Sequence, residues 1–343
     1  MEPITRFSAQ PTAKRRRASD RCSMAIGAFG LASLLCIGAE AFGLDTMNVA
    51  ISTKTFQAAI FPIAQDHGYM KEEGIDCKTV YIEATPGIQA MAAGTIEFTN
   101  SGTSALVALA RGSAPLKVVL ATNDQVLQWL VTRPNISSAK DLKGKKIATT
   151  GVAAVGTFML KQILTKYGLD GVKDVNYIDP GPNNQLTSLI SGVVDAAVLG
   201  PDQRMIALDN GMKELFYFGK EVKNSWGTLA TSDRVIKEKP KMLAGFIKAS
   251  LKALRLIRQD RDGTIAALMK FSGAERAQSV RVYDDTIGSF TRNGTVDDET
   301  QRNDLMIIRQ VAGVTETIPN ARAYDFSFAL EADQQLNRAN WRP

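Results

Sequence analysis

Two polar, glycine-containing segments follow predicted strands and begin predicted helices. The first holds Asn100, Ser101, Gly102, Thr103 and Ser104, and the second spans residues 150–157. The N-terminus of a helix offers unpaired backbone N–H groups and the positive end of the helix dipole, which attract carboxylate, sulfonate, nitrate or phosphate groups. Both segments are therefore candidate ligand-binding sites. The alternative is that their Ser, Thr and Asn residues are ordinary helix caps.

The candidate ligand-binding residues of the second segment are Gly151, Ala154, Gly156 and Thr157. Gly151 and Gly156 have the spacing of a phosphate loop, but Thr157 occupies the position of its lysine. Without that cation, ATP binding is not expected. The segment instead predicts an uncharged cradle for an anion, formed by backbone N–H groups and small side chains.

Two further segments follow predicted strands at the place where open α/β sheets bind ligands. One is a turn formed by Thr55, Phe56 and Gln57, in which Phe56 would stack on the ligand or cover it. The other holds Pro201 and Asp202, and the Asp202 carboxylate would bind an amino or ring N–H group. Core packing is the alternative for Phe56 and for a further aromatic candidate, Trp226. For Asp202, the alternative is a solvated loop carboxylate.

Side chains suited to catalysis or metal binding are few. His67 is the only histidine, and Cys77 has no cysteine or histidine near it in the sequence. With a single histidine, we expect neither a Ser-His-Asp catalytic triad nor a histidine-rich metal site. We expect Cys77 to be a small buried hydrophobic residue, and we expect no enzymatic activity, no metal and no cofactor.

An α/β fold must position these segments, because strand-like and helix-like patterns alternate along the chain. A third section, from about Trp226, is predicted to be mostly helical. Strands are predicted over residues 47–51, 78–82, 96–99, 116–121, 127–132, 147–150, 175–178 and 196–199, and helices over 58–69, 88–93, 101–111, 157–167 and 185–191.

The longest predicted helix begins near Pro240. Proline is favoured at a helix start, where its missing N–H would be unpaired anyway. The apolar residues that recur along one face are Leu243, Phe246, Ile247, Leu251, Leu254 and Ile257. The cations Lys241, Lys248, Lys252, Arg255 and Arg258 lie on the opposite side, which we predict to be a solvated face.

The N-terminus has the pattern of a signal peptide. Six Lys or Arg residues occur in residues 1–23, an uncharged stretch covers residues 24–39, and Ala39-Glu40-Ala41 fits the small-x-small rule for cleavage. We predict cleavage after Ala41. A retained membrane anchor is the alternative, but 16 residues with three glycines are short for a bilayer span. The export route, general or twin-arginine, stays open.

The part that follows the leader has 302 residues, which is enough for two domains. Its formal net charge is about +3, compared with +6 for the whole chain, because the leader holds six basic and three acidic residues. So small an excess gives no support for nucleic-acid binding. Cys77 is the only cysteine left in it, so an intramolecular disulfide is impossible.

Four segments, in this order, resemble the nitrate/sulfonate/taurine-type substrate-binding proteins of ABC importers, a family related to the thiamine-pyrimidine synthases. Residues 61–75 are similar to an A-x-x-x-G-Y/F-F/M-x-x-x-G-L/I segment, and residues 94–104 to a G-x-x-D-F…G stretch. Residues 141–148 match a D-L-K-G-K-x-I/V turn, and residues 192–198 a G-x-V-D-A-A strand. Many relatives then carry Trp-Glu-Pro, where this chain has Gly200-Pro201-Asp202.

The resemblance implies a two-lobed periplasmic-binding fold of type II with the ligand cleft between the lobes. Residues 42–122 and 227–343 would form lobe I, and residues 123–226 lobe II. The implied function is that of a monomeric periplasmic receptor, which binds a small organic anion and delivers it to an ABC permease and its ATPase. A thiamine-pyrimidine-synthase-like enzyme, a binder of a pyrimidine precursor, and a sensor partner that presents ligand to a membrane receptor are the alternatives.

Overall fold

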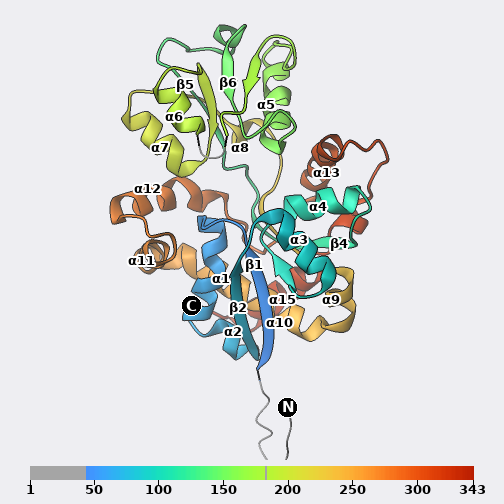
Figure 1. Cartoon of the computed structure of the whole chain (residues 1–343). Coiled ribbons are helices and arrows are strands. Elements are labelled where there is room, and N and C mark those ends of the chain that lie inside the picture. Colours follow the sequence, from blue (N-terminus) through green and yellow to red (C-terminus); the bar gives the residue numbers. More distant parts are fainter. Residues whose placement is uncertain (1–43, 182–183) are drawn as a thin grey trace, which may run out of the picture. The chain divides into compact units, whose positions relative to one another are not determined.

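The computed structural model describes residues 44–181 and 184–343, so the predicted signal peptide and its cleavage site lie outside the described residues. Two five-stranded sheets organise the described part of the chain (Figure 1). The first sheet has the order β2-β1-β3-β10-β4, and the second has the order β7-β6-β8-β5-β9. The predicted α/β class is confirmed.

The strands of the first sheet are β1 (Asp45–Ile51), β2 (Ile75–Tyr81), β3 (Phe98–Thr99), β4 (Leu116–Asn123) and β10 (Trp226–Ser232). Those of the second are β5 (Trp129–Thr132), β6 (Lys146–Ala148), β7 (Asn176–Ile178), β8 (Ala196–Leu199) and β9 (Lys213–Tyr217). In the first sheet β1 runs parallel to β2 and β3, and β10 is antiparallel to β3 and β4. In the second, β6 is parallel to β7 and β8, and β5 is antiparallel to β8 and β9. The chain passes from the first sheet to the second after β4 and returns before β10.

Helices cover both sheets. Around the first sheet are α1 (Phe56–Asp66), α2 (Tyr69–Glu72), α3 (Ala84–Ala93), α4 (Gly102–Ala110), α9 (Asp233–Glu238), α10 (Pro240–Gln259), α11 (Arg261–Ser272), α12 (Arg276–Thr286), the 3-10 turn η2 (Ile287–Ser289), α13 (Asp298–Ala312), α14 (Asn320–Ala323) and α15 (Ser327–Arg338). The second sheet carries η1 (Ala139–Leu142), α5 (Val155–Lys166), α6 (Gln185–Ile190), α7 (Pro201–Asp209) and α8 (Phe218–Glu221).

Each sheet has its own hydrophobic core. In the first, strand β1 packs against α1 and α10, and Phe246 of α10 lies between Phe61 and Phe98, with ring centroids 5.6 and 4.5 Å away. In the second, α5 packs its Leu160 and Ile163 onto β6. All six apolar residues that the periodicity of α10 predicted to be buried are buried. Burial of large apolar side chains supplies most of the stability of such cores.

The prediction of a solvated cationic face on α10 is wrong for Lys252, which is 5% exposed. Its ammonium lies 2.6 Å from a carboxylate oxygen of Glu72 and 2.8 Å from one of Glu73. These two acidic residues end α2, which packs on α10. The cation is buried because a tertiary neighbour supplies its counter-charges, which the sequence of one helix does not reveal.

Four more details of the elements differ from the predictions. The section after Trp226 is mostly helical, as predicted, but it begins with strand β10. The predicted helix over residues 58–69 is two helices, because Gly68 has a left-handed φ of 77° that breaks it. Helix α7 and strand β9, between Pro201 and Tyr217, were not predicted. Thr55–Gln57 is the start of α1 and not a separate turn.

Candidate functional site

A cleft of about 440 Å³ lies between structures that belong to the two sheets. On the side of the first sheet, its lining comes from the start of α1, with Thr55 and Gln57, and from parts of α11 and α12. From the second sheet it receives Gln128, just before β5, and the first residues of α7. Trp226, the first residue of β10, completes the wall where the chain returns to the first sheet.

A smaller inner cavity of about 180 Å³ shares Thr55, Gln57 and Trp226 with the cleft. Its other walls come from the loop between β3 and α4 and from the adjoining strands β4 and β10. The lining is rich in hydroxyl and amide groups: Thr53, Asn100, Ser101, Thr103, Thr122 and Thr228. Such a lining offers many neutral hydrogen-bond donors and acceptors to a small polar ligand.

Gly102 is required by the geometry of the inner cavity. A Cβ atom at this position would collide with the side chain and carbonyl of Thr228 on β10. The glycine therefore lets the first turn of α4 approach the neighbouring strand and brings its backbone N–H groups to the cavity.

Three helices begin at the walls of these cavities: α1 after Thr55, α4 after Ser101 and α7 after Gly200. Among the described residues, no side chain caps any of the three N-termini. The capping interpretation of the Ser, Thr and Asn residues is therefore wrong for α4, and it is also wrong for α5, which has no side-chain cap among the described residues. Ser232, Asp260 and Asp297 cap α9, α11 and α13 by accepting a backbone N–H, whereas α3 and α15, away from the cavities, also have no side-chain cap in the described part of the chain. In α1 the Ala58 N–H already donates to the Thr55 carbonyl, and α7 begins with Pro201, which has no N–H. The other first-turn N–H groups are available to water or to a ligand.

The residues of the first predicted segment lie together, but they differ in what they contact. The Asn100 side-chain oxygen accepts hydrogen bonds from the Ser52 N–H at 3.0 Å and the Ser52 hydroxyl at 3.2 Å. The Ser101 hydroxyl donates to the Ser52 hydroxyl at 3.0 Å. These bonds fix the loop. Thr103 is exposed and lines the inner cavity, whereas Ser104 lines neither cavity.

Phe56 lines the cleft as a fixed wall. Its side chain is 5% exposed, and its ring centroid lies 4.6 Å from that of Phe290 and 5.8 Å from that of Tyr283. Core packing, the alternative weighed for Phe56, is therefore present. Phe56 is nevertheless one of the residues that line the cleft, so stacking on a ligand stays a prediction.

The second predicted segment does not line either cavity directly. The Thr157 hydroxyl donates to the Gly151 carbonyl at 2.6 Å, and the Thr157 side chain is buried. Gly156 instead contacts Gln128: a Cβ at position 156 would lie 2.5 Å from the Gln128 carboxamide oxygen. Gln128 lines the cleft. The second segment therefore contacts the cleft lining through the Gln128 side chain. Ala154 precedes α5 and provides no side-chain cap.

Pro201 and Asp202 form the first turn of α7 and line the cleft. The Gln278 amide lies 3.5 Å from a carboxylate oxygen of Asp202. Although Asp202 is exposed to the cleft, the surrounding protein removes part of its hydration, and this desolvation raises the pKa of the carboxyl group more than the contact with Gln278 lowers it. The cleft also has a cation, Lys54, whose ammonium lies 5.0 Å above the ring centre of Tyr81.

Sequence reasoning missed Gln128, Lys54 and Gln278. Lys54 directly precedes the predicted Thr55–Gln57 segment, so its position was a usable signal. Gln128 and Gln278 come from distant parts of the chain, and both line the cleft, Gln128 from just before β5 and Gln278 from α12, which packs on α7.

The residues proposed to be non-catalytic lie apart from the cleft. His67 is exposed and follows the last turn of α1. Cys77 is 3% exposed, and burial raises the pKa of its thiol to about 12. Within residues 44–181 and 184–343, no group of three or more His, Cys, Asp or Glu side chains could hold a metal ion. In the same ranges, no helix combines the length and hydropathy needed to cross a bilayer.

Comparisons with known proteins agree with this geometry. The family model described as NMT1/THI5 like matches residues 55–263. The structure of a putative periplasmic sulfonate-binding protein of a sulfonate ABC transporter, SsuA from Methylobacillus flagellatus KT, is similar with a TM-score of 0.72 and 18% identity, over 88% of this chain and 98% of that one. No curated protein matches the sequence.

Two other similar structures differ in function from each other. The periplasmic nitrate-binding protein NrtA from Synechocystis PCC 6803 has a TM-score of 0.63 and 12% identity, over 85% of this chain and 89% of that one. The desulfurization enzyme DSZB has a TM-score of 0.63 and 13% identity, over 85% of this chain and 99% of that one. The predicted two-lobed periplasmic-binding fold is confirmed by these likenesses.

Proposed function

We propose, from the fact that the chain belongs to the NMT1/THI5-like family, that it is a solute-binding protein of an ABC importer. The observation that carries the proposal is the position of three helix N-termini without side-chain caps, those of α1, α4 and α7, at the cleft and the adjoining inner cavity. The cleft would bind a small organic ligand, and the bound ligand would be passed to a membrane permease.

An anionic group is the ligand feature that the site supports best. Backbone N–H groups at the starts of α1 and α4 would donate to it, and Thr55, Thr103 and the Lys54 ammonium would add donors. Sulfonate and nitrate are the ligands named for two proteins of similar structure, and a carboxylate has the same chemistry. Asp202, on the opposite wall, would face a part of the ligand that carries N–H or O–H groups.

The ligand would act by shifting a population of conformations. Its two ends would contact walls that belong to different sheets, so the conformation in which both walls approach would bind it more tightly. Residues 42–122 and 227–343 would move as lobe I, and residues 123–226 as lobe II.

The predicted location and partners fit this role. The basic and apolar N-terminal pattern would direct export, with cleavage after Ala41, and the receptor would work in the periplasm with an ABC permease and its ATPase. The two binding proteins of similar structure are periplasmic. We propose that the protein acts as a monomer.

An enzymatic role is the second candidate, because DSZB has a similar structure. Two observations favour binding instead. His67, the single histidine, is exposed beyond the end of α1, and the thiol of Cys77 is buried in β2 with a raised pKa. Neither side chain is among the residues that line the cleft.

A thermal-shift screen tests the proposal. The panel holds nitrate, sulfonates, aliphatic and aromatic carboxylates, and pyrimidines. A ligand at 100 times its dissociation constant stabilises the protein by about 2.7 kcal/mol, which is readily detected. We expect stabilisation by at least one anion. A response to pyrimidines alone would contradict the anion assignment, and turnover of a stabilising compound would contradict the binding role.

A matched pair of variants locates the site. Thr103 lines the inner cavity and the adjacent Ser104 does not, so Thr103→Ala should weaken the ligand-induced shift and Ser104→Ala should leave it unchanged. Equal effects of the two substitutions would argue against the inner cavity as the binding site.

A further inference from the structure

The two halves of the structure contact each other at α13 and at the interface between α7 and α12. At α13, Asp297 and Glu299 form ion pairs with Lys223 beside the apolar contacts. Helix α13 makes apolar contacts with both halves. Its Ile307 is 1% exposed and belongs to the core around the second sheet, whereas Leu305 and Ile308 pack with α4 and β4 of the first sheet. Apolar contacts of this kind resist separation because separation would expose buried apolar surface to water.

The contact between α7 and α12 is polar instead. The Arg281 guanidinium of α12 binds both carboxylate oxygens of Asp209 on α7, at 2.7 and 3.2 Å. Arg204 of α7 binds Asp285 of α12 at 2.5 Å. Both pairs join a helix of the second sheet to a helix that packs on the first, and the Gln278–Asp202 contact lies at the cleft end of the same interface.

Arg204 is anchored to the second sheet. Its guanidinium lies 5.0 Å from the ring centre of Trp129 on β5, and its Nε donates to Glu214 of β9 at 2.6 Å. Its side chain is 18% exposed. This fixed geometry leaves one end of the guanidinium directed at Asp285 across the interface.

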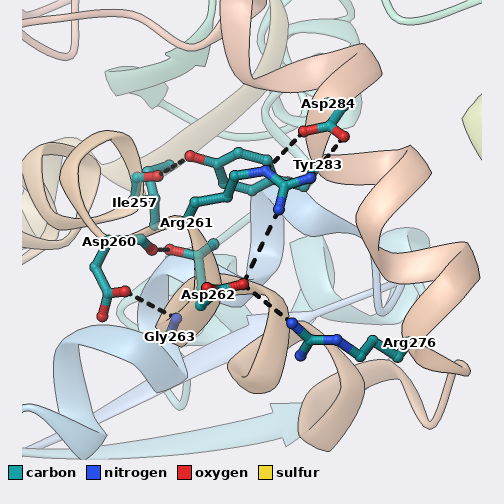
Figure 2. Close-up of polar contacts among 9 residues, drawn as sticks. Ile257, Asp260, Arg261, Asp262, Gly263, Arg276, Tyr283 and Asp284 are labelled. Atoms are coloured by element: carbon teal, nitrogen blue, oxygen red, sulfur yellow. Dashed lines mark hydrogen bonds and ion pairs between the residues drawn. The ribbon is translucent and has the colours of Figure 1, made fainter.

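The other partner, α12, is anchored by contacts with α10 and α11, as Figure 2 shows. The Tyr283 hydroxyl donates to the Ile257 carbonyl at the end of α10, at 2.7 Å. Arg261 of α11 binds the two carboxylate oxygens of Asp284 at 3.0 and 2.7 Å, and Arg276 binds Asp262 at 3.0 Å. Helix α12 is therefore held by α10 and α11, and its Arg281 and Asp285 contact α7.

We propose that the two ion pairs between α7 and α12 form a latch, and that the lobes open by rotation about the apolar contact of α13 when the latch is released. The Arg281–Asp209 pair is solvent-accessible, with side-chain exposures of 45% and 60%, whereas in the other pair Arg204 is 18% and Asp285 36% exposed. Breaking the exposed pair costs little compared with exposing Ile307. The latch also controls access to the cleft, because α7 begins with Pro201 and Asp202 at the cleft wall. The inference concerns the cleft of the proposed function but needs no ligand.

The experiment measures a distance between the lobes without ligand. Spin labels are placed on cysteines introduced at the exposed positions Lys140, in η1, and Glu238, in α9, with Cys22 and Cys36 replaced by serine. Cys77 stays, because it is buried and its thiol pKa is about 12. Asp209→Arg and Arg281→Asp each place like charges across the interface, and the double variant restores a pair of reversed polarity.

We expect each single reversal to lengthen the distance distribution and to shift the ratio of closed to open molecules by about two- to fivefold. The double variant should return to the wild-type distribution, and 1 M NaCl should lengthen that of the wild type, because salt screens exposed pairs. Wild-type distances in both single reversals, or failure of the double variant to restore them, would overturn the latch. A thermal-shift response to an anion in the same protein would leave the binding role intact.

Discussion

The carboxamide of Gln128 lies against the backbone of Gly156, so that the cleft wall and the start of α5 are in direct contact. A Cβ at position 156 would lie 2.5 Å from the carboxamide oxygen and 3.2 Å from the nitrogen of Gln128. That oxygen is buried and has no hydrogen-bond partner in the described part of the protein. Because Gly156 has no side chain, the Gln128 carboxamide can occupy this position in the cleft wall.

Gly156→Ala should displace the Gln128 side chain and weaken ligand binding by about tenfold, while the melting temperature of the free protein changes little, because the end of a glutamine side chain can move. Titration with an anion found in the thermal screen measures the affinity. In a Gln128→Ala background the same alanine should have no further effect. Full additivity of the two substitutions would show that Gly156 acts by another route.

Asp304 provides a test of the hinge region, because it ties α13 to the segment that precedes β10. Its Oδ1 accepts the Asn224 amide at 2.9 Å and the Ser225 N–H at 3.0 Å. Its Oδ2 accepts the hydroxyls of Ser225 at 2.6 Å and Tyr324 at 3.1 Å. Burial raises the pKa of Asp304, and a proton on Oδ2 would be tolerated because hydroxyls can also accept.

Asp304→Asn should therefore cost less than about 1 kcal/mol, whereas Asp304→Ala should cost about 2–4 kcal/mol, since it leaves two N–H donors buried without acceptors. Urea unfolding measures both. Asp298→Ala, at an exposed position on the same helix, is the control and should be nearly neutral. An equal loss in the asparagine and alanine variants would indicate that the negative charge itself is needed.

The buried Lys252 predicts a graded series along α10. Lys252→Met should destabilise the protein by about 1–3 kcal/mol, because Glu72 and Glu73 lose a charged donor. Lys248→Met should cost less, since Lys248 contacts only Glu73, at 3.1 Å, and is more exposed. Lys241→Met, at an exposed position, should be neutral. Equal midpoints of chemical unfolding for all three variants would exclude a special role for Lys252.

Stability should fall in acid partly through Asp297. Hydrogen bonds from the Lys223 ammonium and then from Thr300 lower the pKa of this carboxyl group to about 2, from an ordinary value of 3.8. A lowered native pKa means that the stabilisation is complete above pH 4 and is lost as the pH falls toward 2. Asp297→Asn, which keeps a good helix cap, should show a smaller drop in melting temperature between pH 5 and pH 2 than the wild type. Parallel curves for the two proteins would contradict this.

The periodicity of apolar residues identified the elements whose buried face is made of a regular apolar repeat. The buried face of α10 is an example, since its six predicted apolar residues are all in the core. Strand β10 escaped notice because it carries buried Thr228, Thr231 and Ser232, so hydropathy does not alternate along it. Helix α7 begins with Gly200 and Pro201, which are typical of a loop.

The candidate site was predictable where a strand leads directly into a helix, as at Asn100–Thr103 and at Thr55–Gln57. It was not predictable where tertiary contacts determine which side chains line the site. The loop with Gly151 and Thr157 has the composition of a binding loop, but the Thr157 hydroxyl is used within the loop. Gln128 directly precedes β5 and lines the cleft, and its contact with Gly156 joins residues 28 positions apart.

The antiparallel insertion of β10 between β3 and β4 constrains the order in which the protein folds. Strand β4 pairs with the first sheet only through β10, and the entire second sheet lies between them in the sequence. A long unstructured loop makes such a pairing slow. The second sheet, which is continuous in sequence, should therefore form early and shorten that loop. The first sheet then closes only after residue 232 has emerged during synthesis or export, and until then its edge at β3 is open to pairing with other chains.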